Sequence, residues 1–122
     1  MSQFAPTYLT DAVLITGIVE RGRGDEVISA AREAGAAGAI LYHARGVGAR
    51  ERLGILAIAV EADKDVVTML IPADQQEFII RHIYSAAGLD RPGAGMLYAM
   101  PLDKVAAYIP EAMRQRLEET RK

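Results

Sequence analysis

Two stretches of the chain repeat one pattern of apolar and polar positions. An apolar run covers Val13–Ile18, and a second covers Val66–Ile71. Each run is followed by a segment with apolar residues at helical spacing, and these segments end at Gly35 and Gly88. The ends of the two runs, like the two glycines, are 53 positions apart. The pattern therefore predicts a strand followed by a helix twice.

Further strands are predicted at residues 39–45, 55–60 and 96–100. The first helix is predicted from Asp25 to Ala34, and the second opens at Pro72. The buried stripes of the helices are predicted from apolar spacing to be Val27, Ala31, Ala34, Phe78, Ile79, Ile83 and Ala87. Two β-α-β units in so short a chain predict an α+β fold, a ferredoxin-like βαββαβ sandwich with its helices on one face of an antiparallel sheet.

The segment Ile55–Val60 is apolar at every position, whereas a strand with one solvent-exposed face should alternate apolar and polar residues. Both of its faces are therefore expected to be covered. We interpret the second cover as another subunit, with the C-terminal helix as the alternative. Residues 61–65 are expected to form a polar connection to the next strand.

The chain divides into an N-terminal arm (1–11), one domain (12–102) and a tail (103–122) in which Pro110 opens a predicted amphipathic helix. There is no cysteine, which excludes disulfides, thiolate zinc sites and cysteine nucleophiles. A net charge of −2 argues against a nucleic-acid partner. With no signal peptide or long apolar run in the sequence, we expect a soluble, cytoplasmic protein.

Two glycine-rich loops, Gly46–Gly48 and Gly93–Gly95, are candidates for phosphate binding because successive backbone N–H groups can point into one concavity. Arginines beside the first loop, at positions 45, 50 and 52, could add charge-assisted contacts. The alternative is a pair of tight turns with solvated arginines. A third anion candidate is Arg21–Gly24, at a junction of strand and helix.

Catalytic and metal-binding signals are weak. His43 and His82 fall on different elements without metal-ligand spacing. Capping and solvation are expected to account for the acidic residues Asp25, Glu26, Asp63 and Asp65. The residues therefore give no case for an enzyme.

Three motifs in order resemble PII-type signalling proteins over residues 12–102. Arg45-Gly46-Val47-Gly48 resembles the start of that family's T-loop, and Ile71-Pro72-Ala73-Asp74 opens the second helix as in the family. Gly93 to Tyr98 is similar to the family's B-loop and the strand after it. The resemblance implies a homotrimer that binds adenine nucleotides between subunits and reports the cell's energy, nitrogen or carbon state to a transporter, enzyme or regulator.

Departures from the family point to a divergent branch. The loop at residues 49–54 is short and lacks the tyrosine or serine that the family modifies. Met96 stands where the family has a phosphate-binding lysine, with Arg91 as a possible substitute, and Arg50 stands where the family has a glutamine beside magnesium. The resemblance then implies ADP, AMP or ATP, or another small anion, without an obligatory metal.

The resemblance implies one site made from two subunits. Its residues would be Arg45, Gly46, Val47, Gly48, Ala49, Arg50, Leu70, Gly93, Ala94, Gly95 and Met96. Among these, Arg45 and Arg50 would meet phosphate, and Leu70 would pack on the base.

Three classes of function remain open from the sequence. The leading hypothesis is a trimeric, non-enzymatic, nucleotide-responsive regulator of a partner such as a membrane transporter. The second is a structural or metal-tolerance trimer of the CutA type, which needs no nucleotide. The third is a small enzyme on the same fold, for which His43 is the candidate near the first loop.

Overall fold

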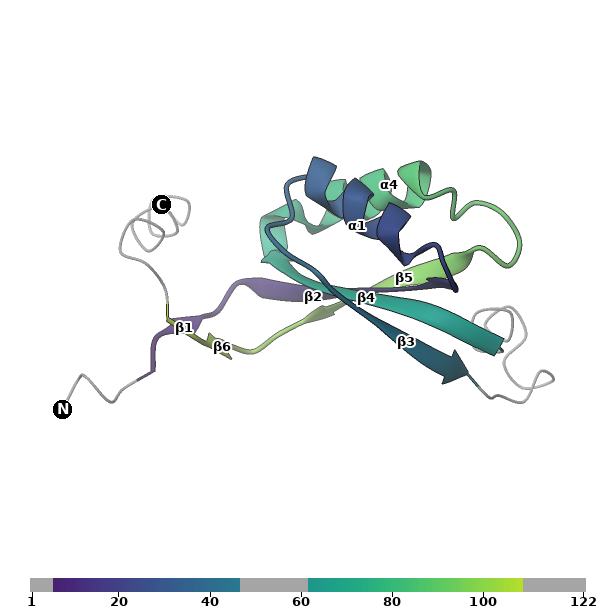
Figure 1. The fold of residues 1–122 in the computed structure, drawn as a ribbon. Coiled ribbons are helices and arrows are strands. Elements are labelled where there is room, and N and C mark those ends of the chain that lie inside the picture. The colour runs from purple at the N-terminus through teal and green to yellow at the C-terminus, as the bar shows by residue number, and fades with distance from the viewer. Residues whose placement is uncertain (1–5, 47–61, 109–122) are drawn as a thin grey trace.

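The structure is a computed structural model and describes residues 6–46 and 62–108. In these two stretches, two helices lie on one face of a four-stranded antiparallel sheet (Figure 1). Its elements are β2 (Ala12–Glu20), α1 (Gly24–Glu33), β3 (Ile40–Gly46), β4 (Ala62–Pro72), the 3₁₀ helix η3 (Ala73–Gln75), α4 (Gln76–Ala86) and β5 (Gly95–Pro101). The strand order β3-β4-β2-β5 confirms the ferredoxin-like α+β prediction.

A short ribbon projects beyond the four-stranded sheet. It pairs β1 (Tyr8–Leu9) with β6 (Val105–Ala106), so the N-terminal arm and the start of the tail lie side by side (Figure 1). The predicted strand at 55–60 and the predicted helix after Pro110 lie outside the described residues.

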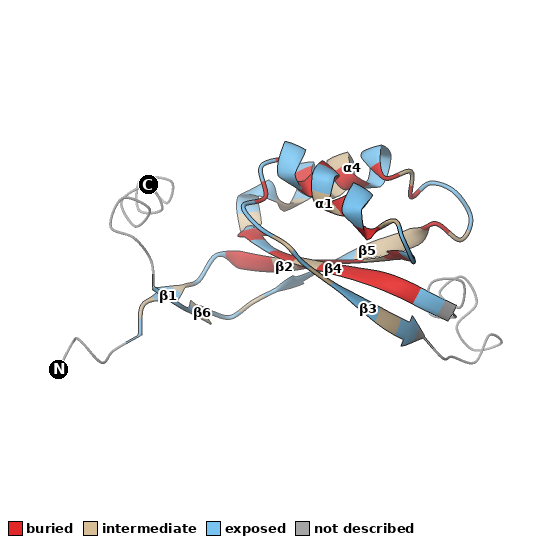
Figure 2. Cartoon of the chain, in the orientation of Figure 1, coloured by how far each residue is buried: buried red, intermediate tan, exposed pale blue. Residues whose placement is uncertain are grey.

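The core lies between the sheet and the two helices. In β2 and β4 the side chains that face the helices alternate along the strand, as in Val13 and Ile15 or Val67 and Met69, and all four are buried (Figure 2). The predicted helical stripes are buried with one exception. Phe78 is 61% exposed, because α4 presents Ile79 and Ile83 to the sheet and turns Phe78 outward.

The acidic start of β4 corrects the prediction of a polar connection. Asp63, Lys64 and Asp65 belong to the strand and pair with β3, and Lys64 and Asp65 are buried. These residue types are depleted in strands, but the ladder to β3 and the partners of Asp65 stabilise the extended backbone here.

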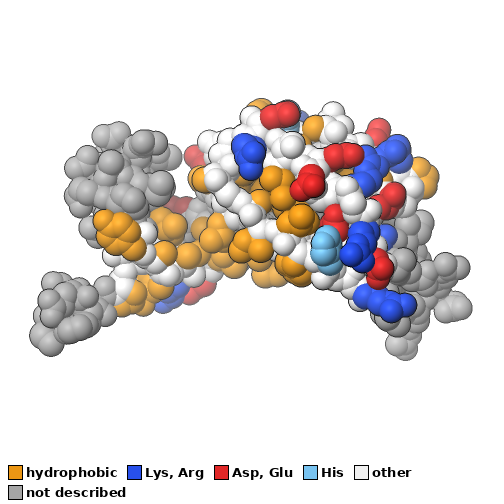
Figure 3. Space-filling model, viewed as in Figure 1, with side chains coloured by type: hydrophobic (Ala, Val, Ile, Leu, Met, Phe, Trp, Pro, Cys, Tyr) orange, Lys and Arg blue, Asp and Glu red, His pale blue; other side chains and the backbone are white. Residues whose placement is uncertain are grey.

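The face of the sheet away from the helices carries exposed apolar side chains, beside buried residues such as Val66 and Thr16. Residues directly opposite one another in the register share a face, so the outward side chains can be read from the pairing. The most exposed apolar ones on this open face are Ile40, Tyr42, Leu70, Tyr98 and Met100. In the side view, hydrophobic side chains run along the sheet, while charged side chains gather at the end where β3 stops (Figure 3). Exposed apolar side chains gathered on one sheet face are typical of an interface.

Candidate functional site

The two glycine loops lie at the same end of the sheet but on opposite edges. Gly46 ends β3 opposite Ala62, and Gly95 begins β5 opposite Val19. β3 and β5 are the two edge strands, with β4 and β2 between them. Three strand spacings separate the edges by about 14 Å. One chain therefore does not bring the described ends of the two loops together into one cleft.

The first loop is described only at its start. Arg45 is exposed and lies directly opposite Asp63 on β4. Gly46 ends the strand, and the candidates Val47, Gly48, Ala49 and Arg50 lie outside the described residues.

The glycines of the second loop have a local structural role. Gly93 and Gly95 adopt φ of 78° and 138°. A Cβ on Gly95 would overlap the Ile18 carbonyl oxygen and Val19, so glycine lets β5 approach β2 closely. Ala94 is 2% exposed and packs in the core. The Ala94 N–H donates to the Arg91 carbonyl oxygen at 3.1 Å, so this N–H group is not free for a ligand.

The remaining candidates lie on or beside the strands. Met96 is half-buried opposite Ile18. Leu70 is 46% exposed on the open face, eight residues along β4 from Ala62 and so about 25 Å from the first loop. Within one chain the structure does not bring Leu70 to either glycine loop. Arg91, the suggested substitute for the missing lysine, donates from Nε to the Gly88 carbonyl oxygen at 3.0 Å.

The candidate anion site at Arg21–Gly24 is occupied by a carboxylate of the chain itself. One carboxylate oxygen of Asp65 accepts hydrogen bonds from the backbone N–H groups of Gly22 and Gly24, at 2.9 and 3.0 Å. A Cβ on Gly24 would overlap Leu41 and press on Asp65, so the turn needs glycine there. The expectation of an external anion at the start of α1 is therefore wrong.

His43 completes the group around Asp65. Its Nδ1 lies 2.7 Å from the second carboxylate oxygen, and the Asp65 side chain is 3% exposed. Burial alone would raise the pKa of the Asp65 carboxyl, but hydrogen bonds from the Gly24 N–H, His43 and the Gly22 N–H hold that pKa below its usual value. Asp65 is therefore an ionised, structural carboxylate rather than a solvated one.

The sequence pattern places Asp65 in a polar connection, so it predicts no buried role for this carboxylate. The inward positions of β4 are 67, 69 and 71, and the same alternation extended toward the N-terminus reaches 65 and 63. The sequence itself does not show this period, because Val66–Ile71 is an apolar run without alternation.

The arginines of the same turn are paired. Arg21 lies 3.4 Å from Asp63, and Arg23 lies 2.7 Å from Glu26. Arg23 also donates to the Ala87 carbonyl oxygen at 3.3 Å, which ties the turn to the end of α4. These guanidinium groups are balanced locally.

A groove of about 360 Å³ lies on the helix layer. It is lined by Asp25, Glu26, Ser29, Ala30, Glu33 and Ala86. Its acidic lining disfavours a phosphate ligand. His82 is half-buried beside it, as predicted for the partly exposed side of its helix, and lies 3.0 Å from Glu33.

Two searches of the described residues were negative. No three His, Asp or Glu side chains in 6–46 and 62–108 converge as a metal site. None of the helices in those ranges is long and apolar enough to cross a membrane.

Comparison with known proteins supports the fold class. No family model matches the sequence, and no curated relative matches it. Among solved structures, the Arabidopsis thaliana PII protein bound to citrate matches with a TM-score of 0.58 at 21% identity. The match covers 77% of this chain and 79% of that one. The chain therefore has a PII-like fold.

Proposed function

We propose that this protein is a PII-like signalling protein that binds an adenine nucleotide or another small anion between subunits and regulates a partner protein. The observation that carries the proposal is the placement of the glycine loops at one end of the sheet on opposite edges. The first loop of one subunit and the second loop of its neighbour would form one cleft.

The open face of the sheet supports assembly. Side chains such as Ile40, Tyr98 and Met100 leave apolar surface in water, and its burial against other copies is favourable at about 25 cal/mol per Å². Contacts between opposite edges are head-to-tail, and such contacts form a ring when the rotation between neighbouring subunits closes. We propose that the ring is a homotrimer.

The proposed class of ligand rests on the charge beside the first loop and on the ligand of the similar plant structure. Arg45 offers a cation at the first loop, and the plant PII was solved with citrate, a small polyanion. Adenine nucleotides and a transporter or regulator as partner come from the family resemblance. Catalysis is not part of this proposal.

Complementation between subunits tests the shared cleft. Arg45→Glu damages the first loop, and Gly93→Asp damages the second, because aspartate tolerates the positive φ of Gly93 while it repels an anion. Each variant alone should lose ADP binding in calorimetry. Unfolded and refolded together in equal amounts, they should recover about a quarter of the wild-type sites, since one pairing in four joins two intact loops in a head-to-tail ring.

Matched controls separate charge from shape. Arg45→Gln and Gly93→Asn keep the size of each substitution without the negative charge and should bind ADP more tightly than their acidic counterparts. Light scattering confirms that every mixture is assembled. An assembled mixture that recovers no binding would overturn the shared cleft. Wild-type protein that binds none of ATP, ADP, AMP, cyclic AMP, bicarbonate or citrate would overturn the proposed function.

A further inference from the structure

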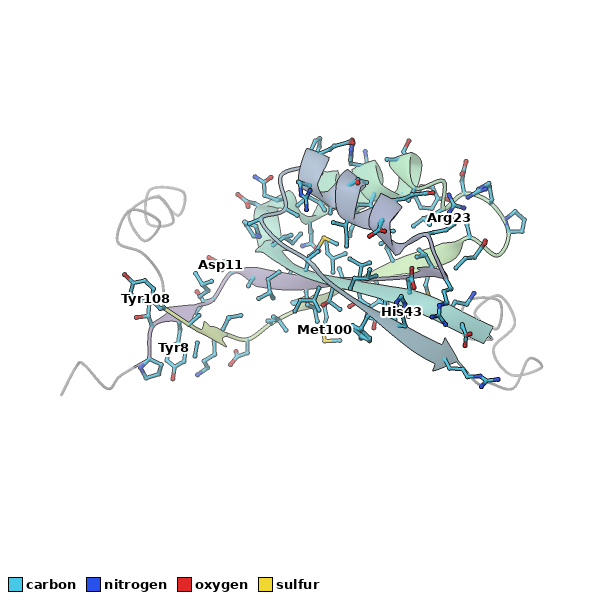
Figure 4. The ribbon with its side chains drawn as sticks, viewed as in Figure 1. Tyr8, Asp11, Arg23, His43, Met100 and Tyr108 are labelled. Atoms are coloured by element: carbon cyan, nitrogen blue, oxygen red, sulfur yellow. The ribbon has the colours of Figure 1, made fainter. Side chains whose placement is uncertain are left out.

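The β1–β6 ribbon continues the pairing of β2 with β5 beyond the end of the four-stranded sheet. In the sheet, Leu14 lies opposite Met100. In the ribbon, Tyr8 lies opposite Ala106, and the register does not shift between the two strand pairs. Alternation along this common ladder places Tyr8 on the open face, with Leu14 and Met100. In Figure 4, Tyr8 and Met100 both point away from the helices. The ribbon therefore extends the open face past the end of the sheet.

The ribbon is small and leaves its aromatic side chain exposed. Figure 1 shows it projecting from the sheet, away from α1 and α4. Tyr8 is 48% exposed, and the Lys104 amine lies 5.0 Å from the centre of its ring. Each strand contributes two residues, and a two-stranded ribbon alone is at best marginally stable in water. The ribbon therefore needs a further surface to pack on.

An apolar surface lies at the opposite edge of the same end of the sheet. β3 begins at Ile40, opposite Thr68, so β4 continues toward Pro72 beyond the described pairing with β3. Leu70 is the next outward residue of β4 and a diagonal neighbour of Ile40, within about 8 Å. Ile40 is 67% exposed and Leu70 is 46% exposed. We call these two residues the apolar step.

The ribbon does not reach this step within its own chain. Leu70 lies opposite Leu14 on β2, and Tyr8 lies six positions before Leu14, which is about 20 Å along the strands. The ribbon continues β2 and β5, whereas the step belongs to β3 and β4, the other half of the sheet. In a head-to-tail arrangement, the β5 edge of one subunit meets the β3 edge of the next. That arrangement brings the ribbon of one subunit to the step of its neighbour.

We infer that the β1–β6 ribbon packs on the apolar step of a second copy of this chain, with Tyr8 against Ile40 and Leu70. This inference rests on the proposed function, since it names the surfaces that meet in the proposed head-to-tail assembly. The contact lies at the end of the sheet away from the glycine loops. Leu70, about 25 Å from the first loop, then contacts a neighbouring subunit instead of a nucleotide base.

Disulfide crosslinking tests the contact, because the chain has no cysteine of its own. Two double variants, Tyr8→Cys with Leu70→Cys and Tyr8→Cys with Ile40→Cys, place one thiol on the ribbon and one on the step. A disulfide needs Cα atoms within about 7 Å, which these positions of one chain do not satisfy. After mild oxidation with glutathione disulfide, at least one of the two variants should give covalent dimers and trimers on a non-reducing gel.

Matched controls make the crosslink specific. The three single variants carry only one of the thiols. The double variant Tyr8→Cys with Phe78→Cys carries an accessible thiol on the helix layer instead of the step, since Phe78 is 61% exposed on α4. All of these controls should remain single chains on the gel. Light scattering before oxidation should show that each variant is assembled like wild type.

The outcomes separate the inference from the proposed assembly. Covalent dimers in Tyr8→Cys alone would show that ribbons meet one another in place of the step, and would overturn the inference. Assembled double variants without crosslinks would mean that another surface, such as the tail after residue 108, covers the step. That result would also overturn the inference, while the assembly would stand. If wild type is a single chain in light scattering, the proposed assembly fails, and the inference fails with it.

Discussion

The two faces of the sheet carry similar apolar side chains but differ in what covers them. On the helix face, Val67 is fully buried beneath α1 and α4. On the open face, Tyr98 is 43% exposed. The helix face is explained by folding of a single chain. The open face is explained only by a further cover, which we propose to be other subunits. In this proposal, one chain separates residues that stabilise the fold from residues that direct assembly.

The largest effect is expected from a charge on the helix face. Val67→Asp places a carboxylate among apolar side chains with no partner. A buried, unpaired charge costs about 3–5 kcal/mol, which approaches the whole stability of a small domain. We expect no cooperative urea transition by circular dichroism. A transition like that of wild type would show that this face is not the core.

The same charge on the open face should act on assembly instead. Tyr98→Asp should leave the circular dichroism spectrum of wild type and reduce the mass in light scattering to that of one chain. Tyr98→Phe keeps the ring and should remain assembled. If Tyr98→Asp stays assembled at micromolar concentration, the open face is not the interface and the comparison of faces fails.

The sequence predicted most of the fold because its signals are local. Apolar runs and helical stripes identified β2, α1, β3, β4, α4 and β5 within a few residues, and the doubled β-α-β order then implied the sheet. The start of β4 was not predictable in this way. Asp63 and Asp65 are residues typical of turns, and their strand geometry depends on partners about forty positions away.

The candidate site was predictable only in part, for the same reason. Glycine and arginine spacing identified both loops, but not that they lie on opposite edges, which follows from strand order. The anion candidate at Arg21–Gly24 was wrong because its N–H groups bind Asp65. No local pattern connects that turn to the start of a distant strand.

A smaller loss of stability is expected when Asp65, on the helix side of the sheet, is replaced. Asp65→Asn should lower the free energy of unfolding at pH 7 by about 1–3 kcal/mol, since hydrogen bonds to a charged group are lost. The folded pKa of Asp65 lies below the unfolded value of about 3.9, so its contribution is complete above that value and is lost as the pH falls through the folded pKa.

Urea unfolding of both proteins below pH 5 checks the direction of this pH dependence. Wild type should lose stability toward acid more steeply than Asp65→Asn, and the two curves should converge. Each measurement uses the same protein concentration, because assembly contributes to apparent stability. Parallel curves would mean that Asp65 has the same pKa in the folded and unfolded chain.

The smallest effect is expected on the outer side of the helix layer, and it tests whether every exposed aromatic residue marks an interface. Phe78 is 61% exposed and stacks on His82 with ring centroids 6.3 Å apart. Phe78→Ser should change stability by about 0.5 kcal/mol or less and leave the assembled mass unchanged. The neighbouring Ile79→Ser, at a residue 1% exposed, should cost several times more in urea unfolding. If Phe78→Ser instead reduced the assembled mass, subunits would meet through the helices. The exposed aromatic residues of the open face would then need another explanation, because contact through the helix layer would leave them in water.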